Sequence, residues 1–416
     1  MAIGTIIKTE RLRKNMKQET LAKEICSISH LSRIESGKTE PSEELLRKLS
    51  DRLGVLLAVE SENVEMEQLQ DQLETVINER DQEGAAQLVE ELNVLLHRVP
   101  IEAEIRLDLE LMLLRAQSVL PKQEENILQS LAKFTETDFN LTPIQAFRAQ
   151  QIKGMASYGV GELKVCLDCF SEGAELAELL PLSRFERADF AYVQSIAFMA
   201  DGQKFEALEK AKDALSYFQS IMTGRRVLEC HLVSGVAYKQ IGQLDRALET
   251  FQHAEKVCRQ FDLQTFLGMI YQNLGTVYNA MNQSDLAISY FRQAIDCKEQ
   301  PEDQVYTILS LLRIYEELGG GEKVRHWLEE GNRLLSQLSE PIRQRFKTHF
   351  DVHQALLEEN DERIEASLLT AVRYFQKKKD KNQTRHYSRR LAEFYASKRK
   401  YKKAVDYYRQ IVELED

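Results

Sequence analysis

The stretch YQNLGTVYNAMNQSDLAISYFRQAI, residues 271–295, decides the fold of most of the chain. Its first half contains Gly275 and Tyr278, and its second half contains Ala287, Phe291 and Ala294, with polar turn residues between the halves. Apolar residues recur every three or four positions in both halves, which predicts two helices joined by a turn. The small residues at 275 and 287 would let these helices approach closely, while the aromatic side chains fill the space between hairpins.

The segment before it, SGVAYKQIGQLDRALETFQHAEKV, has the same skeleton. HEAT-type repeats have periods near 40, but the skeleton resembles the tetratricopeptide repeat, whose usual period is about 34 residues. We therefore expect tetratricopeptide hairpins with lengthened helices, and one or two divergent repeats within residues 68–135. When the small residue at 287 serves as the marker, equivalent positions recur every 37 to 41 residues, at Cys166, Ala207, Ala247, Ala287, Val324, Ile364 and Ala404.

The composition also predicts an all-α protein. The chain has 416 residues but only 18 glycines and 7 prolines, which is too little turn chemistry for a many-stranded fold. Its longest uncharged run, residues 263–284, is rich in asparagine and glutamine and is not a membrane span. No secretory signal is visible and the six cysteines are scattered, so we expect a cytoplasmic protein with reduced thiols.

Two residue pairs have spacings that metal sites also use. Cys166 and Cys169 form a CxxC pair, and His349 and His353 lie four residues apart. The cysteines lack a second pair and the histidines lack an evident third ligand, so we expect buried helix cysteines and surface histidines. With no phosphate-binding GxxxxGK[ST] motif either, we expect no metal, no cofactor and no enzyme active site.

Charge is distributed unevenly along the chain. Residues 1–55 carry 11 basic and 8 acidic side chains, and residues 372–410 carry 14 basic and 3 acidic ones. The last six residues carry −3 and the whole chain −11, so residues 56–371 carry −22. A basic head, an acidic body and a basic end indicate separate roles.

The head, residues 4–55, is expected to form five short helices. QETLAKEI and SISHLSRIE are joined by a tight turn, and Pro41 would lie in the first turn of the stretch that follows. Gly37 and Gly54 stand where helices should end. Two short helices joined by a small turn are the helix-turn-helix geometry, in which the second helix enters the major groove of DNA.

QETLAKEICSISHLSRIESGKTEPS, residues 18–42, resembles the Cro/cI-type helix-turn-helix family. The resemblance implies that Gln18 touches a phosphate, that Ser27 caps the recognition helix, and that a double-stranded operator is the partner. We expect Glu35 to pair with Arg11 inside the domain. The matching positions are Gln18, Leu21, Ala22, Ile25, Leu31, Ser32, Ile34, Glu35, Gly37 and Pro41. The candidate DNA-binding residues are Gln18, Ser27, Ile28, Ser29, His30, Ser32, Arg33 and Lys38.

A repeat array of this kind has a concave surface lined by the first helix of each hairpin. Side-chain amides carry donors and acceptors, so they can hold the backbone of an extended peptide whatever its sequence. Amides are also common on exposed helix faces, so a single amide does not indicate a binding site. The clustering of several amides, with the cations Lys239 and Arg313 beside them, does indicate one. The candidate peptide-binding residues are Tyr192, Lys239, Gln272, Asn273, Thr276, Asn279, Tyr306 and Arg313.

A Cro-type head joined to a tetratricopeptide body resembles the RNPP family of peptide-quorum-sensing regulators. The resemblance implies a right-handed repeat superhelix, a cytoplasmic transcription regulator and a short signalling peptide bound in the groove, with protease or sporulation control as a candidate role. Two alternatives stay open. One is a Rap-like protein that binds or dephosphorylates a sporulation response regulator through its helical body, and the other is an arbitrium-type phage lysogeny regulator.

We expect three segments: a helix-turn-helix domain at 1–55, a linker at 56–67, and a repeat domain at 68–416 that binds peptide and dimerises. The terminal hairpin has no following repeat to cover it, although such arrays need a polar cap. Its last helix offers Val405, Tyr408, Ile411 and Val412. We therefore expect this basic end to pack against the acidic body of a second copy, giving a homodimer.

Overall fold

The computed structural model describes residues 3–14, 16–54, 59–98, 103–136 and 141–413. Within these ranges it contains helices and turns and no strand, which confirms the all-α prediction. None of the helices there is both long and apolar enough to cross a bilayer. The chain divides into two compact units, residues 1–233 and 234–416.

The head contains four helices within its described residues, not the predicted five. The last stretch, EELLRKLSDRL, has no glycine or proline to break it and forms one helix. Pro41 lies outside this helix, immediately before its N-cap Ser42, so its predicted place in the first turn is wrong. Gly54 ends the helix with φ 59°, as predicted. The four helices are α1 (Ile3–Arg13), α2 (Gln18–Ala22), α3 (Ile28–Glu35) and α4 (Glu43–Leu53).

The rest of the first unit is also helical. The predicted linker at 56–67 overlaps a helix that begins at Val59, which leaves only residues 55–58, outside the described part of the chain, between α4 and that helix. The described residues between 68 and 135 lie in four helices and the turns that connect them, and the predicted helical pattern is confirmed there. The helices are α5 (Val59–Glu79), α6 (Gln82–Arg98), α7 (Ala103–Gln117), α8 (Glu124–Glu136), α9 (Pro143–Gly159), α10 (Leu163–Leu179), α11 (Arg184–Asp201), α12 (Lys204–Ser220) and the first part of α13 (Gly224–Gln240).

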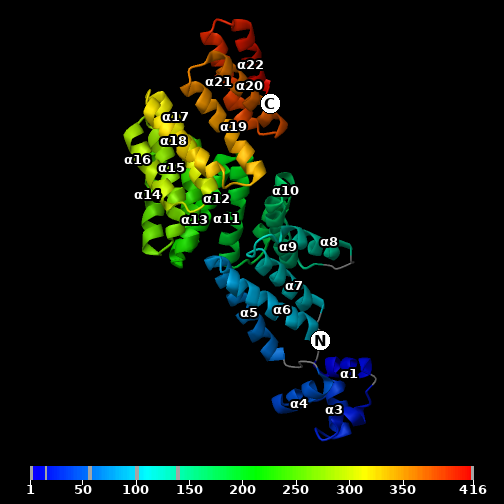
Figure 1. Ribbon diagram of the computed structural model, residues 1–416. Helices are drawn as coiled ribbons and strands as arrows, with labels where there is room; N and C mark the ends of the chain where they lie inside the picture. The colour runs from blue at the N-terminus through cyan, green and yellow to red at the C-terminus, as the bar shows by residue number, and fades with distance from the viewer. Residues whose placement is uncertain (1–2, 15, 55–58, 99–102, 137–140, 414–416) are drawn as a thin grey trace. The chain divides into compact units, whose positions relative to one another are not determined.

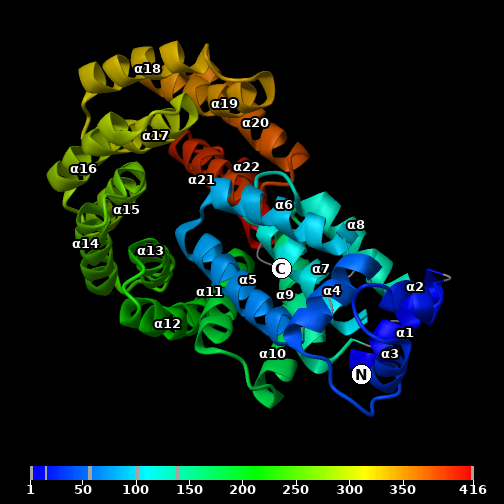
Figure 2. The ribbon, with the colours of Figure 1, turned by 90° about the horizontal axis from the view of Figure 1, so that it is seen from below.

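In the second unit each helix from α14 onward packs against the next one along the chain. Figures 1 and 2 show α14 to α19 following one another side by side. The elements are α14 (Leu244–Gln260), the short 3-10 helix η1 (Gln264–Phe266), α15 (Leu267–Ala280), α16 (Ser284–Cys297), α17 (Pro301–Glu317), α18 (Gly321–Leu335), α19 (Glu340–Leu357), α20 (Asp361–Lys377), α21 (Lys381–Ser397) and α22 (Tyr401–Glu413).

The structure confirms the repeat register. Each of the seven marker positions is the fourth residue of its helix, in α10, α12, α14, α16, α18, α20 and α22. All seven side chains are buried, from Cys166 with no exposed surface to Ile364 at 8%. Several of these helices have 17 residues, which accounts for the period of about 40.

Close helix approach depends on glycine facing phenylalanine. A Cβ atom added to Gly275 on α15 would lie 2.8 Å from the ring of Phe291 on α16. Gly235 meets Phe251 in the same way at 2.6 Å, and Gly154 meets Phe170 at 2.4 Å. A contact under 3.0 Å cannot be accommodated without movement of one helix, so the glycine sets how near the two helices lie.

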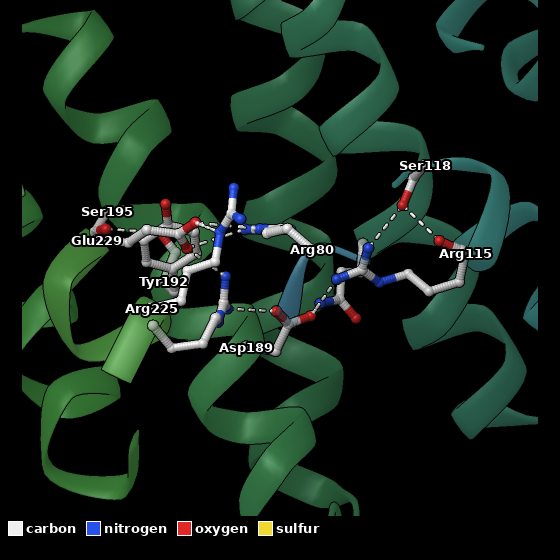
Figure 3. Close-up of polar contacts among 10 residues, drawn as sticks. Arg80, Arg115, Ser118, Asp189, Tyr192, Ser195, Arg225 and Glu229 are labelled. Atoms are coloured by element: carbon white, nitrogen blue, oxygen red, sulfur yellow. Dashed lines mark hydrogen bonds and ion pairs between the residues drawn. The ribbon is translucent and has the colours of Figure 1, made fainter. Parts of the chain in front are cut away.

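A buried cluster of charges joins helices of the first unit (Figure 3). Asp189 on α11 accepts hydrogen bonds from Arg115 on α7 at 2.5 Å and from Arg226 on α13 at 2.7 Å. Glu229 on α13 accepts hydrogen bonds from Arg226 at 2.9 Å and from Arg80, in the turn after α5, at 3.3 Å. These bonds connect segments that lie up to 149 residues apart in the sequence.

Arg226 is the most enclosed member of this charge cluster. Its side chain has no exposed surface, and its guanidinium carbon lies 4.2 Å from the ring centre of Tyr192 and 4.5 Å from that of Phe218. Burial alone would raise the pKa of Asp189, but the guanidinium groups of Arg115 and Arg226 outweigh burial and hold that pKa below its usual range. The carboxylate therefore stays ionised, and each charge depends on the others for compensation.

Asp189→Asn is expected to destabilise the first unit by about 3–5 kcal/mol, because it leaves the buried Arg115 without a counter-charge and Arg226 with Glu229 alone. Urea unfolding followed by far-ultraviolet circular dichroism would report this as a lower midpoint. Glu330→Gln is the control, since the Glu330–Arg333 pair is exposed and should contribute less than about 1 kcal/mol. Equal midpoints for the two variants would contradict a stabilising role of the buried cluster.

Candidate functional site

The predicted recognition helix is α3. Ser27 is its N-cap, and the Ser27 side chain accepts a hydrogen bond from the backbone N–H of His30 at 3.2 Å, which confirms the predicted cap. Leu31 and Ile34 are buried in the head core with Ile7, Leu21 and Leu49. The opposite face of α3 is left to solvent.

That outer face carries most of the candidate DNA-binding residues. Ile28 is 48% exposed, an unusual state for an isoleucine without a partner. His30 is half-buried, and the remaining members of the set are exposed: Ser27, Ser29, Ser32, Arg33 and Lys38. The structure thus brings these side chains together on one surface, and their contact with DNA stays a prediction.

An internal ion pair fixes the recognition helix to α1. Arg11 donates to Glu35 through Nε at 2.7 Å and through Nη2 at 2.9 Å, as predicted. Burial opposes the charged form of Glu35, but hydrogen bonds from Arg11 and Gln18 lower its pKa overall. The Gln18 amide donates to Glu35 at 2.6 Å, so its side chain points into this ion pair. The Nε2 group carries a second N–H, so this hydrogen bond still leaves Gln18 one donor, and its phosphate contact stays a prediction.

Five of the eight candidate peptide-binding residues line one cavity in the second unit. This cavity, here called the amide groove, has a volume of about 510 Å³. Its walls come from α13, α15, α17 and the connection after α16, and the predicted residues among them are Lys239, Gln272, Asn273, Thr276 and Tyr306. The amides sit in a local network, because Asn273 Oδ1 accepts from Lys239 Nζ at 3.0 Å and Gln272 Nε2 donates to Ser310 at 3.2 Å.

Sequence reasoning missed Lys298, which lies just beyond the end of α16 and also lines the amide groove. Its ammonium group donates to Thr307 at 2.7 Å and to the carbonyl oxygen of Asp303 at 3.2 Å. Burial lowers the pKa of Lys298 to about 8, and burial likewise lowers the pKa of Lys239. Lys298 directly follows the predicted second helix of a hairpin, and that position was the one available signal for it.

The other three candidates are elsewhere. Arg313 lines a neighbouring cavity with Tyr306, and Asn279 lines neither cavity. Tyr192 is 6% exposed and packs under Arg226 in the first unit, so its predicted position on a groove surface is wrong. An aromatic residue at a groove register is equally suited to cover a buried guanidinium, and only tertiary packing distinguishes the two.

The pairs with metal-like spacing have structural roles. Cys166 and Cys169 are buried, as predicted, and burial raises the pKa of the Cys166 thiol to about 12. His349 and His353 are also buried, so their predicted surface position is wrong. His349 contacts the hydroxyl of Tyr387 at 2.5 Å, and His353 contacts Glu316 at 2.5 Å. Across the described residues, no group of three or more His, Cys, Asp and Glu side chains could hold a metal.

Comparison with known families agrees with the two-part architecture. The helix-turn-helix family matches residues 7–59, and tetratricopeptide-repeat families match residues 228–300 and 389–416. The second match favours tetratricopeptide over HEAT repeats for the central hairpins. The third places a repeat at the end of the chain, where α22 carries the marker Ala404.

Known proteins resemble the chain over most of its length. The chain is 25% identical over 403 residues to the transcriptional activator NprA of Geobacillus stearothermophilus, covering 94% of this chain and 97% of NprA. The apo quorum sensor NprR from B. thuringiensis aligns with a TM-score of 0.71 at 19% identity, covering 84% of this chain and 99% of NprR. NprR in complex with its cognate peptide NprX aligns with a TM-score of 0.58 at 18% identity, covering 83% and 99%. The chain therefore has the two-part architecture of the RNPP-family regulators, a helix-turn-helix domain joined to tetratricopeptide repeats.

Proposed function

We propose that this protein is a cytoplasmic transcription regulator that binds operator DNA through α3 and is controlled by a short peptide bound in the amide groove. The observation that carries the proposal is the pairing, in one chain, of an exposed recognition-helix face with a groove lined by amides and lysines. The likeness over 94% of the chain to a protein named as a transcriptional activator supports it. The Rap-like alternative has only likeness of fold in its favour, and the arbitrium-type alternative stays a prediction from the sequence.

The head supplies both kinds of contact that DNA recognition needs. Base-edge contacts specify sequence, whereas contacts to phosphates position the protein. Arg33 and His30 carry the donors best suited to base edges on α3, and the exposed Lys38 and Lys17 are suited to phosphates. The ion pair between Arg11 and Glu35 holds α3 rigidly, which reduces the entropy lost on binding.

Arg33→Ala and His30→Ala should each change the DNA sequence that the full chain selects from a random-sequence duplex library. A good base contact contributes about 1–3 kcal/mol of discrimination, enough to alter the enriched motif. Lys48→Ala is the control, because Lys48 is exposed on α4 and pairs with Glu44 at 2.7 Å. If both α3 variants enriched the wild-type motif, base reading by this face would be refuted.

The amide groove is suited to an extended peptide. Asn273 and Gln272 present donors and acceptors to the cavity, so they can bracket a peptide backbone. Lys239 donates to Asn273 alone among the described residues, which leaves further N–H groups for a ligand. A peptide that preferred one arrangement of the repeats would shift the balance of arrangements, and only such differential affinity can regulate DNA binding.

Asn273→Ala should reduce the amount of small peptide that copurifies with the full chain from its native cell, measured by mass spectrometry of acid-released material. Loss of one buried hydrogen bond costs about 1–3 kcal/mol, so retention should fall several-fold or more. Asn279→Ala is the matched comparison, since Asn279 lies on the same helix but outside the cavity lining. Equal retention by wild type and Asn273→Ala would move the site elsewhere.

We also propose that α22 forms a homodimer contact. Tyr401, Val405, Tyr408 and Val412 are 42–63% exposed and recur at spacings of four, three and four, so they share one face of the helix. Ile411, also predicted for this surface, is instead buried at 6%. The basic charge of residues 372–410 would attract the acidic body of a second copy.

Val405→Glu should shift the mass measured by light scattering from dimer to monomer, because it buries a charge in the apolar contact. A surface variant is preferred to deletion, since Tyr387, Leu391 and Tyr395 of α21 belong to the core shared with α20. Val94→Glu is the control: Val94 is 45% exposed on α6, against 47% for Val405. A dimer that persists in Val405→Glu would rule out this contact.

A further inference from the structure

A second, smaller cavity adjoins the amide groove. It has a volume of about 190 Å³ and lies among α17, α19 and α21. Asp303 and Tyr306 line both cavities, so the two lie next to each other along α17. We call it the arginine cavity, after Arg313 on α17 and Arg345 on α19 in its walls; His349 and Gln383 lie there too.

Arg313 is an unsatisfied charge. Its Nε is buried and has no hydrogen-bond partner. Among the residues that the structure describes, its guanidinium group forms neither a hydrogen bond nor an ion pair. A guanidinium group in a protein interior is costly unless a carboxylate or another anion compensates it.

Nearby acidic groups do not provide this compensation. Glu316, one turn further along α17, already pairs with His353 at 2.5 Å and with Arg390 at 3.2 Å. Asp303 precedes Arg313 by ten residues on the same helix, which is about 15 Å along the axis. Arg345, on the opposite wall, has only a distant partner in Asp380 at 3.8 Å.

The histidines around the cavity add no negative charge. Burial and the proximity of Arg313 lower the pKa of His349 to about 3, and they do the same for His386. Both rings are therefore neutral at physiological pH. The charged side chains in the cavity walls are Arg313 and Arg345, together with Glu302 and Asp303 near the start of α17, about 15 Å along the helix axis from Arg313. Gln383 Oε1 is buried in the same cavity and lacks a donor. The cavity thus offers an unfilled cationic donor and an unfilled acceptor.

We propose that the arginine cavity binds a carboxylate of the peptide whose backbone lies in the amide groove. A carboxylate would accept from Arg313, in the geometry that guanidinium groups favour, and a neighbouring peptide N–H would donate to Gln383 Oε1. This inference rests on the proposed function and adds a chemical requirement to it. The carboxylate is either the peptide's C-terminus or an aspartate or glutamate side chain, since both present the same two oxygens.

The experiment uses random hexapeptide libraries, captured on the full chain and quantified by mass spectrometry. One library has free C-terminal acids, the second has C-terminal amides, and the third has free acids but no aspartate or glutamate. Wild type should retain the first library and lose about tenfold in one of the other two. Loss in the amide library assigns the C-terminus, and loss in the third assigns a side chain.

Arg313→Gln should lower retention of the first library about tenfold. Arg313→Lys should give a retention between that of Arg313→Gln and that of wild type, because lysine keeps the positive charge but cannot form the two parallel hydrogen bonds of a guanidinium group. Arg325→Gln, an exposed arginine on α18, is the control and should match wild type. Thermal unfolding of each variant confirms that it folds. Wild-type retention in Arg313→Gln, with loss in Asn273→Ala, overturns the arginine cavity and leaves the amide groove. Unchanged retention in Asn273→Ala, or none in wild type, overturns the proposed function itself.

Discussion

The repeats depend on how closely the two helices of a hairpin approach each other. In three hairpins a glycine of the first helix faces a phenylalanine sixteen residues later, at Gly154 and Phe170, at Gly235 and Phe251, and at Gly275 and Phe291. A methyl group at such a glycine would overlap the ring, so the helices would have to separate. Because each hairpin supplies the surface on which the next one packs, a change in one spacing would be passed to its neighbours.

The first unit adds a different constraint. Its buried charges form a closed set, in which Asp189 and Glu229 are shared among Arg80, Arg115 and Arg226. Such a set stabilises the fold no more than apolar packing of the same volume would. Its hydrogen bonds are directional, however, so displacing any helix that contributes to it would leave a buried charge uncompensated. We interpret it as a device that fixes the turn after α5 against α11 and α13, where apolar side chains alone would tolerate sliding.

In the second unit, three basic side chains line the two cavities. Lys239, Lys298 and Arg313 line cavities without forming an ion pair among the described residues, although the chain as a whole is acidic. Lys239 and Lys298 donate hydrogen bonds to neutral groups, so neither has a carboxylate counter-charge among the described residues. A ligand carboxylate would supply such a counter-charge, which is the chemical basis of the proposed peptide site.

Much of the fold was readable from sequence. The marker positions lie at the fourth residue of seven helices. They could be found from the sequence because each hairpin needs a buried residue at the same helix crossing, so this residue recurs at a nearly constant interval. The Ser27 cap and the Arg11–Glu35 pair were also predicted, because the resemblance of residues 18–42 to the Cro/cI-type family implies the layout of the whole head. The number of head helices was overestimated, since the described residues of the head form four helices and not five.

Side-chain environment was decided by tertiary structure alone. Tyr192 and Tyr306 occupy comparable repeat positions, yet one is buried under Arg226 and the other lines the groove at 57% exposure. His349 and His353 were read as surface residues, and the packing of α17, α19 and α21 buries both. Helical periodicity determines which face of a helix a residue occupies. Whether that face meets solvent, a ligand groove or another charge depends on residues brought from distant parts of the chain, so the sequence determined the architecture and the packing determined the chemistry of each site.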